Sequence, residues 1–225
     1  AVGGSQFNHR VLTLPRMSEK KRAAVLTREF STGGADVTAP LDDYMLLSTD
    51  KKTKADTVLA TRVESAVIET YINLAAACGL KLYSIDLALA GQIKLVRATP
   101  ELAGKSFVML QFDGDSLIAG LYEKGQYKYS TRSRLFNPRG TEASGAEIGQ
   151  KLSGLIQFQT AAKSEHPIKA VYFGGSTAAD LAVCTPACRG LQLEVAAYPE
   201  TENIKLPEGI RLADIALAAG NLIGR

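Results

Sequence analysis

Two glycine-containing turns are the segments whose residue types and spacing could bind a phosphate group. Asp113-Gly114 separates two apolar runs, and Gly174-Gly175 lies between an apolar run and an expected helix. Backbone amides in such turns, above all at the start of a helix, can donate hydrogen bonds to phosphate or adenosine. Both turns are equally explained as structure, because Asp-Gly suits a hairpin and Gly-Gly a tight strand-to-helix turn. The candidate nucleotide-binding residues are therefore Asp113, Gly114, Gly174 and Gly175.

Other kinds of catalytic site find little support in the sequence. The two histidines, His9 and His166, have no obvious serine or cysteine partner, and we expect both at the surface. The sequence has no Gly-x-Ser-x-Gly turn and no Rossmann fingerprint. It has no Walker loop either, because no lysine follows Gly174-Gly175-Ser176. We predict no catalytic residue and no metal site.

The composition of the 225 residues is that of a soluble globular protein. Apolar residues make up 46% and charged residues 22%, and a net charge of +3 is too small to indicate nucleic-acid binding. No apolar run approaches the roughly 18 to 20 residues of a transmembrane helix. The N-terminus shows no signal-peptide pattern, so we expect none.

The three cysteines indicate a reducing, cytoplasmic environment. They are odd in number and form no disulfide framework, and Cys78 ends an apolar helical face. Cys184 and Cys188 are four residues apart, but Pro186 lies between them and no histidine is near in the sequence. A zinc site needs four ligands, so this pair does not predict one.

The second half of the sequence predicts the elements that position both glycine turns. Residues 107–129 indicate three short strands joined by two tight turns, Asp113-Gly114 and Lys124-Gly125. After an irregular stretch at 133–140, Ser144 and Glu147 match a capping box that begins a helix. The further elements are a strand at 169–173 before the Gly-Gly turn, a helix after it, a strand at 191–195 and a closing helix at 212–222. That last helix carries Leu212, Ile215, Ala219 and Leu222 on one stripe.

The first half alternates strands and helices. Strands are predicted at 11–14, 43–47, 57–61 and 81–86. The first helix runs from an N-cap at Ser18 to about Ser31, with Ala23, Leu26 and Phe30 on one face and Gly33-Gly34 after it. The second ends at Gly79 and carries Val63, Val67, Tyr71, Leu74 and Cys78 at helical spacing. The order is that of a split βαβ unit, followed by a helix at 87–97 and a linker at 98–104.

Several motifs together point to a known family. They are Val11–Pro15, Asp42-Asp43-Tyr44 with Thr57–Arg62, Val63–Leu80 with Ile85-Asp86-Leu87, Phe112-Asp113-Gly114 with Gly125-Gln126-Tyr127 and Tyr129–Arg132, Tyr172–Ser176, and Ala213–Gly220. In type and order they resemble the type IV pilus assembly PilM family, whose relatives include the cytoplasmic domains of L-type components of type II secretion. The resemblance runs almost from end to end.

The resemblance implies a fold and a set of domains. The fold class is α/β (α+β), an actin-like, ribonuclease H-like arrangement of two lobes. Residues 1–103 would form the N-terminal lobe, a split βαβ remnant of actin-like domain I. Residues 104–225 would form the C-terminal lobe, actin-like domain II with a closing helix. If the chain were a fragment of an actin-like ATPase, Asp113-Gly114 and Gly174-Gly175 would line half of a nucleotide site.

The function that the resemblance implies is a cytoplasmic scaffold of a type IV pilus or type II secretion machine. It would lie at the inner face of the cell membrane and dock a short cytoplasmic segment of a membrane-anchored partner, in a groove of the first half. It could also form a homo-oligomer. The alternatives are a fragment of an actin-like ATPase or sugar-kinase-like enzyme that binds ATP-Mg, and a two-domain interaction module without nucleotide history.

Three departures from the family pattern weaken nucleotide binding. Only ten residues precede Val11, where the family has its first phosphate hairpin, so we expect that hairpin to be lacking. Asp113-Gly114-Asp115 replaces the usual Asp-x-Gly order, and Asn137-Pro138-Arg139-Gly140 replaces a Gly-Gly pair. A nucleotide site with only one of its two phosphate loops cannot hold Mg²⁺ and the phosphates in the way that phosphoryl transfer requires. We expect no cofactor in this chain, although ATP and Mg²⁺ remain possible in a full-length protein.

Overall fold

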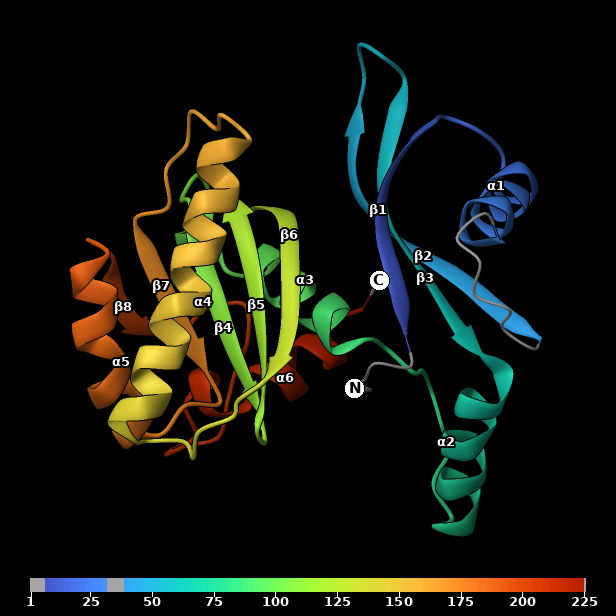
Figure 1. Cartoon of the computed structure of the whole chain (residues 1–225). Helices are drawn as coiled ribbons and strands as arrows, with labels where there is room; N and C mark the ends of the chain where they lie inside the picture. Colours follow the sequence, from blue (N-terminus) through green and yellow to red (C-terminus); the bar gives the residue numbers. More distant parts are fainter. Residues whose placement is uncertain (1–6, 32–38, 225) are drawn as a thin grey trace. The chain divides into compact units, whose positions relative to one another are not determined.

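A computed structural model describes residues 7–31 and 39–224 of the chain (Figure 1). The chain divides between Leu87 and Ala88 into two compact units. We call residues 7–87 the first unit and residues 88–224 the second unit. The division falls before α3 (Ala88–Arg97), earlier than the predicted boundary after residue 103.

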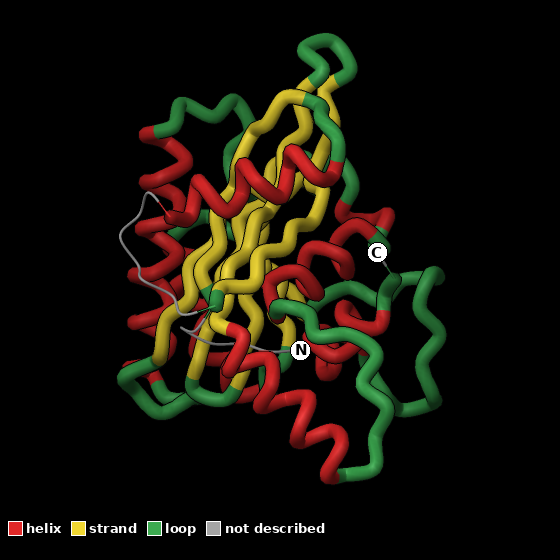
Figure 2. The backbone as a smooth tube through the Cα atoms, turned by 90° about the vertical axis from the view of Figure 1, so that its right-hand side faces the viewer, coloured by secondary structure: helices red, strands yellow, loops and turns green. Residues whose placement is uncertain are grey.

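The first unit is built on a three-stranded antiparallel sheet with the order β1-β3-β2. The strands are β1 (Asn8–Pro15), β2 (Pro40–Asp50) and β3 (Ala55–Glu64), which confirms the strands predicted at 11–14, 43–47 and 57–61. Helix α1 (Glu19–Ser31) crosses one face of this sheet (Figure 2). Its contact with the sheet forms a small core of Leu14, Leu26, Phe30, Val58 and Ala60.

The buried face of α1 differs from the predicted one by one residue. Ala23 is exposed, and Arg22 is buried in its place. The Arg22 guanidinium donates to the Asp56 carboxylate at 2.6 Å and lies over the Tyr44 ring. A charged side chain can therefore lie inward because its partners are supplied by the sheet. The predicted Gly33-Gly34 end of this helix lies outside the described residues.

The end of the first unit departs most from prediction. Helix α2 (Ser65–Ala77) is present, but Val63 belongs to β3 and no residue of α2 is buried. Gly79 follows with a φ of +66°, as a residue just beyond a helix end often does. The strand predicted at 81–86 is wrong, because these residues pair with no strand of the two described sheets. The β-α-β-β-α-β order therefore lacks its last strand.

The second unit contains a mixed five-stranded sheet with the order β6-β5-β4-β7-β8. The predicted meander is confirmed as β4 (Phe107–Asp113), β5 (Ser116–Glu123) and β6 (Gln126–Arg134). Its turns carry positive φ angles at Gly114 and Gly125. β4 pairs in parallel with β7 (Ala170–Gly174), which pairs in parallel with β8 (Glu194–Ala197). β8 begins three residues after the predicted start at 191.

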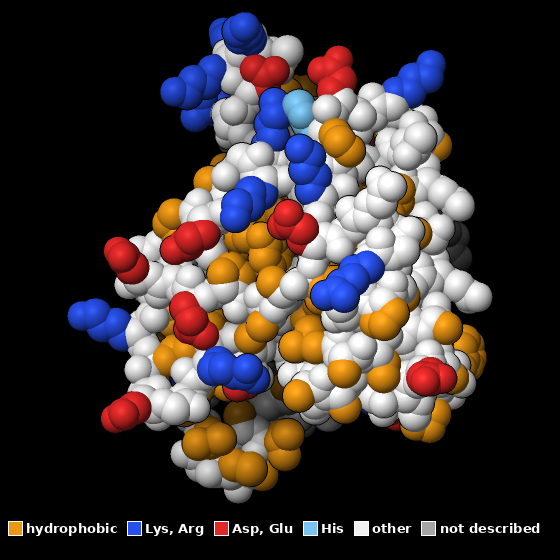
Figure 3. Space-filling model, turned by 90° about the vertical axis from the view of Figure 1, so that its left-hand side faces the viewer, with side chains coloured by type: hydrophobic (Ala, Val, Ile, Leu, Met, Phe, Trp, Pro, Cys, Tyr) orange, Lys and Arg blue, Asp and Glu red, His pale blue; other side chains and the backbone are white. Residues whose placement is uncertain are grey.

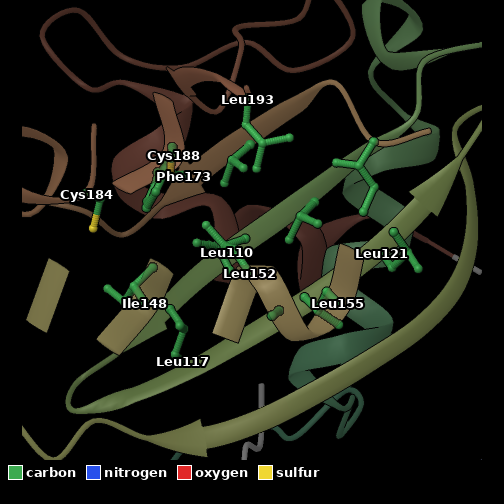
Figure 4. Packing of buried hydrophobic residues seen from close by; sticks show 14 of the residues in the cluster. Leu110, Leu117, Leu121, Ile148, Leu152, Leu155, Phe173, Cys184, Cys188 and Leu193 are labelled. Atoms are coloured by element: carbon green, nitrogen blue, oxygen red, sulfur yellow. The ribbon is translucent and has the colours of Figure 1, made fainter. Parts of the chain in front are cut away.

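Helices cover both faces of this sheet. On one face, α4 (Glu142–Ala161) and α5 (Ala178–Gly190) enclose the main core, most of which is shown in Figure 4. On the other face, Gln92 of α3 contacts β4 and β5, and α6 (Leu212–Leu222) packs against β7 and α3. A 3₁₀ turn (Pro100–Leu102) lies in the predicted linker. The second unit is thus a three-layer α/β/α arrangement.

Two helix details differ from prediction, the cap of α4 and the buried side of α6. α4 is capped by Thr141 and Ser144, one turn before the predicted Ser144–Glu147 box, and Glu147 instead accepts from the backbone of the preceding loop. α5 begins after an N-cap at Thr177, beyond the Gly-Gly turn. α6 has the predicted bounds, but Leu222 is 88% exposed. The buried stripe of α6 consists instead of Leu212, Ala213, Ala216, Ala219 and Gly220.

Candidate functional site

The structure brings the two predicted glycine turns together. Asp113 ends β4 and Gly114 lies in the turn that follows, while Gly174 ends β7 and Gly175 follows it. β4 and β7 are parallel neighbours, with Gln111 paired to Gly174. Both turns therefore lie at the carboxyl edge of the sheet, where ligands of α/β folds usually bind.

Arg139 joins the two turns. Its Nη1 donates to the Gly114 carbonyl oxygen at 3.3 Å, and its Nη2 donates to the Gly175 carbonyl oxygen at 2.9 Å. The guanidinium carbon lies 4.2 Å from the centroid of the Phe112 ring. Such stacking on an aromatic face attracts the cation further. One arginine side chain thus connects both predicted halves of the site.

The charge of Arg139 is balanced by Asp180 in the first turn of α5. The arginine Nε and Nη2 donate to the two oxygens of this carboxylate, whose side chain is only 2% exposed. Asp180 also accepts from the Thr177 amide and hydroxyl, each at 2.8 Å. Burial alone would raise the pKa of Asp180, but the hydrogen bonds from Arg139 and Thr177 outweigh it and lower the pKa. Asp180 is therefore a buried, ionised carboxylate.

The Gly-Gly turn packs against β4 and α6 of the same unit. The Gly175 amide donates to the Ala213 carbonyl oxygen at 2.7 Å, and Gly175 has a left-handed φ of +64°. A Cβ on Gly174 would lie 2.3 Å from the Gln111 amide oxygen. A Cβ on Gly174 would thus displace the Gln111 side chain, whereas one on Gly175 would lie 2.8 Å from the Phe112 carbonyl oxygen, so the fold requires glycine at position 175, whose amide is already bonded.

A magnesium nucleotide does not fit these residues as they are arranged. The Gly175 amide donates to Ala213, and the Asp180 carboxylate lies at the start of α5, where backbone amides would otherwise attract an anion. Asp113 pairs with Arg132 at 3.4 Å, on the exposed side of the turn. Any group bridging the two turns would have to displace Arg139.

Sequence reasoning missed Asp180 and assigned no site role to Arg139. Thr177-x-x-Asp180 has the spacing of a capping box, so the sequence did contain a signal for Asp180. Arg139 gave no local signal, because its partners lie 25 to 41 residues away in the chain.

Other candidate chemistry remains dispersed in the described residues. His9 lies in the exposed part of β1 and His166 in a loop. Within residues 7–31 and 39–224, no group of three potential metal ligands is found, and no helix is long and apolar enough to cross a membrane. The three cysteines are free, with Cys78 exposed and Cys184 and Cys188 buried.

A hollow beside the end of α4 is also lined by polar groups. Glu123, Phe158, Gln159 and His166 contribute to its wall. The Gln159 amide nitrogen donates to the Glu123 carboxylate at 2.8 Å and to the His166 carbonyl oxygen at 2.7 Å. These groups satisfy one another, so they give no sign of a ligand.

Comparison with known proteins identifies the fold. No family model matches the sequence, and no curated protein matches it significantly. A solved structure titled "PilM-PilN type IV pilus biogenesis complex" aligns with a TM-score of 0.75 at 15% identity, over 96% of this chain and 75% of that chain. A Bacteroides thetaiotaomicron protein, described as having an actin-like ATPase fold and unknown function, aligns with a TM-score of 0.52 at 10% identity. That alignment covers 96% of this chain and 70% of the other. The predicted actin-like α/β fold and its resemblance to PilM are confirmed at the level of the fold.

Proposed function

We propose that this chain is a non-enzymatic scaffold of a type IV pilus or type II secretion machine. It would act in the cytoplasm at the inner face of the membrane and dock a short segment of a membrane-anchored assembly partner. The structural neighbour solved as a PilM-PilN complex supports a role in pilus assembly. The observation that carries the docking role is the exposed apolar surface of α2.

Helix α2 and the residues after it form an apolar segment that is left largely uncovered. No residue of α2 is buried, and apolar side chains gather over it at the lower edge of Figure 3. Between Ser65 and Ser84 the charged residues are Glu69 and Lys81. The most exposed large apolar side chains here are Ile72, Leu74, Leu80 and Tyr83. We call residues 65–83 the α2 surface.

The chemistry of the α2 surface fits a short apolar or amphipathic peptide. Few charges and several large apolar groups, including tyrosine, characterise the centres of protein interfaces. Contiguous exposed apolar patches on soluble proteins mark interaction sites. A peptide could lay its apolar anchors along the helix, as in helix-in-groove recognition. We therefore propose the α2 surface as the docking site of the first unit.

Labelled peptides give a direct test of this role. They would cover the cytoplasmic segments of membrane-anchored proteins encoded beside the gene for this chain, and binding would be measured by fluorescence anisotropy. We expect one segment to bind saturably. Leu74→Asp should weaken its binding about tenfold or more, because a charge replaces an apolar anchor.

Phe136→Asp is the matched control for the Leu74 variant. Phe136 is a 91% exposed apolar side chain in the second unit, so its replacement makes the same kind of change elsewhere. Binding by this control should equal that of the unmodified chain. If no segment binds, the scaffold role is contradicted, and an equal loss in both variants would contradict the α2 surface as its site.

The enzymatic alternative has less support. An actin-like ATPase or sugar kinase would need Asp113, Gly114, Gly174 and Gly175 to face a nucleotide. In the structure the Gly114 and Gly175 carbonyls accept from Arg139, and the Gly175 amide is bonded to α6. We therefore do not propose phosphoryl transfer.

A further inference from the structure

We propose that Arg139 and Asp180 act as an internal latch, which takes the place of a phosphate and its counter-ion and closes this site without nucleotide. The latch consists of the ion pair between these side chains and the contacts of Arg139 with Gly114 and Gly175. This inference goes beyond the docking role, and neither depends on the other.

Asp180 supplies the negative group. A helix N-terminus attracts anions through its free amides and the positive end of its dipole. At α5 this position is held by the Asp180 carboxylate, which accepts from the Thr177 amide and hydroxyl. A phosphate entering here would meet a buried carboxylate, and like charges repel strongly where water is excluded.

Arg139 supplies the positive group and the connection. Its guanidinium donates to Asp180 and to one carbonyl from each turn, while its face lies over Phe112. Together these contacts tie the β4–β5 hairpin, the Gly-Gly turn and α5 to one side chain. The connection between these three segments is therefore made by a side chain of the protein itself.

Removing the guanidinium from its position would be costly. Asp180 would lose its charged partner while its side chain remains 2% exposed, and isolated buried charges are strongly unfavourable. A nucleotide carries more negative charge and cannot replace a cation. We therefore expect the unmodified chain to keep the same site geometry in the presence and absence of MgATP.

The test is a titration of the full ¹⁵N-labelled chain with millimolar MgATP, followed by NMR. We expect no saturable shift in the amides of residues 113–115 and 174–180. A saturable shift in these amides would overturn the latch, because a nucleotide would then enter the site with Arg139 present.

Hydrogen–deuterium exchange tests the connecting role separately. Arg139→Ala should increase exchange in residues 113–115 and 174–180 together, although these segments are far apart in the sequence. Arg28→Ala is the matched control, because Arg28 pairs with Glu29 at 3.8 Å in the first unit, away from both monitored segments. If Arg139→Ala does not fold, Arg139→Lys keeps the charge but loses the planar fork, and should raise exchange in both segments to a smaller extent. Exchange equal to that of the control would overturn the proposal.

Discussion

Gly220 of α6 lies against the backbone of Gly91 of α3, so closely that a side chain at position 220 would have no room. A Cβ on Gly220 would lie 2.2 Å from the Gly91 carbonyl oxygen, and a Cβ on Gly91 would lie 2.8 Å from the Asn221 side chain. Both distances are shorter than van der Waals contact, but only the first is to backbone, so the crossing requires glycine at position 220, whereas at position 91 the Asn221 side chain would have to move.

The first prediction concerns this crossing. Gly220→Ala should destabilise the second unit by about 1 to 3 kcal/mol, because the methyl group must push the two backbones apart. Gly154→Ala is the control, since Gly154 lies in α4 with open space around its Cβ position. There the free energy of unfolding should rise by roughly 0.5 to 1 kcal/mol, as expected when alanine replaces glycine inside a helix. Urea unfolding of both variants would check this, and equal stability would contradict it.

The second prediction concerns pH and the buried pair of Arg62 and Asp42. The Arg62 Nε and Nη2 donate to the Asp42 carboxylate at 2.7 and 2.8 Å. The hydrogen bond from Arg62 lowers the pKa of Asp42 in the folded chain and outweighs the opposing effect of burial. The pair therefore contributes stability above the unfolded pKa of about 3.9 and loses it as pH falls through the lower folded value.

Asp42→Asn tests that dependence. It should cost about 3 to 5 kcal/mol near neutral pH, because Arg62 is left buried without its charged partner. The difference in unfolding free energy between the variant and the unmodified chain should shrink below about pH 4. A difference that stays constant between neutral and acidic pH would show that the ion pair is not its source.

The third prediction concerns the cysteines. Burial raises the pKa of the Cys184 thiol to about 12 and that of Cys188 to about 11, whereas Cys78 is exposed. Because the thiolate is the reactive form, an alkylating reagent should modify Cys78 in the native chain and leave the other two intact. In denaturant all three should react. Peptide mass spectrometry would check this, and native labelling of Cys184 would contradict the packing of α5.

The fourth prediction concerns the start of α4. The Thr141 hydroxyl accepts from the Ser144 amide at 3.2 Å, as in a capping box. Thr141→Ala should therefore destabilise the second unit by about 1 kcal/mol in thermal or urea unfolding. Thr160→Ala, a change near the other end of the same helix, should have little effect, because Thr160 bonds only its own helix backbone.

Local patterns predicted much of the fold. The β4–β5–β6 meander follows from short apolar runs separated by the Asp113-Gly114 and Lys124-Gly125 turns, which suit tight hairpins. The bounds of α6 were predicted correctly, because apolar residues recur at helical spacing from Leu212 to Leu222. The side of α6 that is buried was not, since small residues such as Ala216 and Gly220 allow closer packing than Leu222.

The failures have tertiary causes. Residues 81–86 have strand-like composition but pair with no strand of the two described sheets. A strand is stabilised by its contacts with neighbouring strands, so composition alone does not form one here. The candidate glycines are brought together by the parallel pairing of β4 with β7, which no local pattern of the sequence predicted. The role of Arg139 depends on three segments that meet only in the folded chain, so composition and periodicity could not reveal it.

The packing of α3 along α6 has a consequence for synthesis. These are the first and last helices of the second unit, and they lie against each other and against the same side of the sheet. As the ribosome extends the chain, α3 emerges more than one hundred residues before its helical partner. Until residues 212–222 have left the exit tunnel, the apolar side chains of α3 have no α6 to cover them, and transiently exposed apolar surface of this kind favours aggregation.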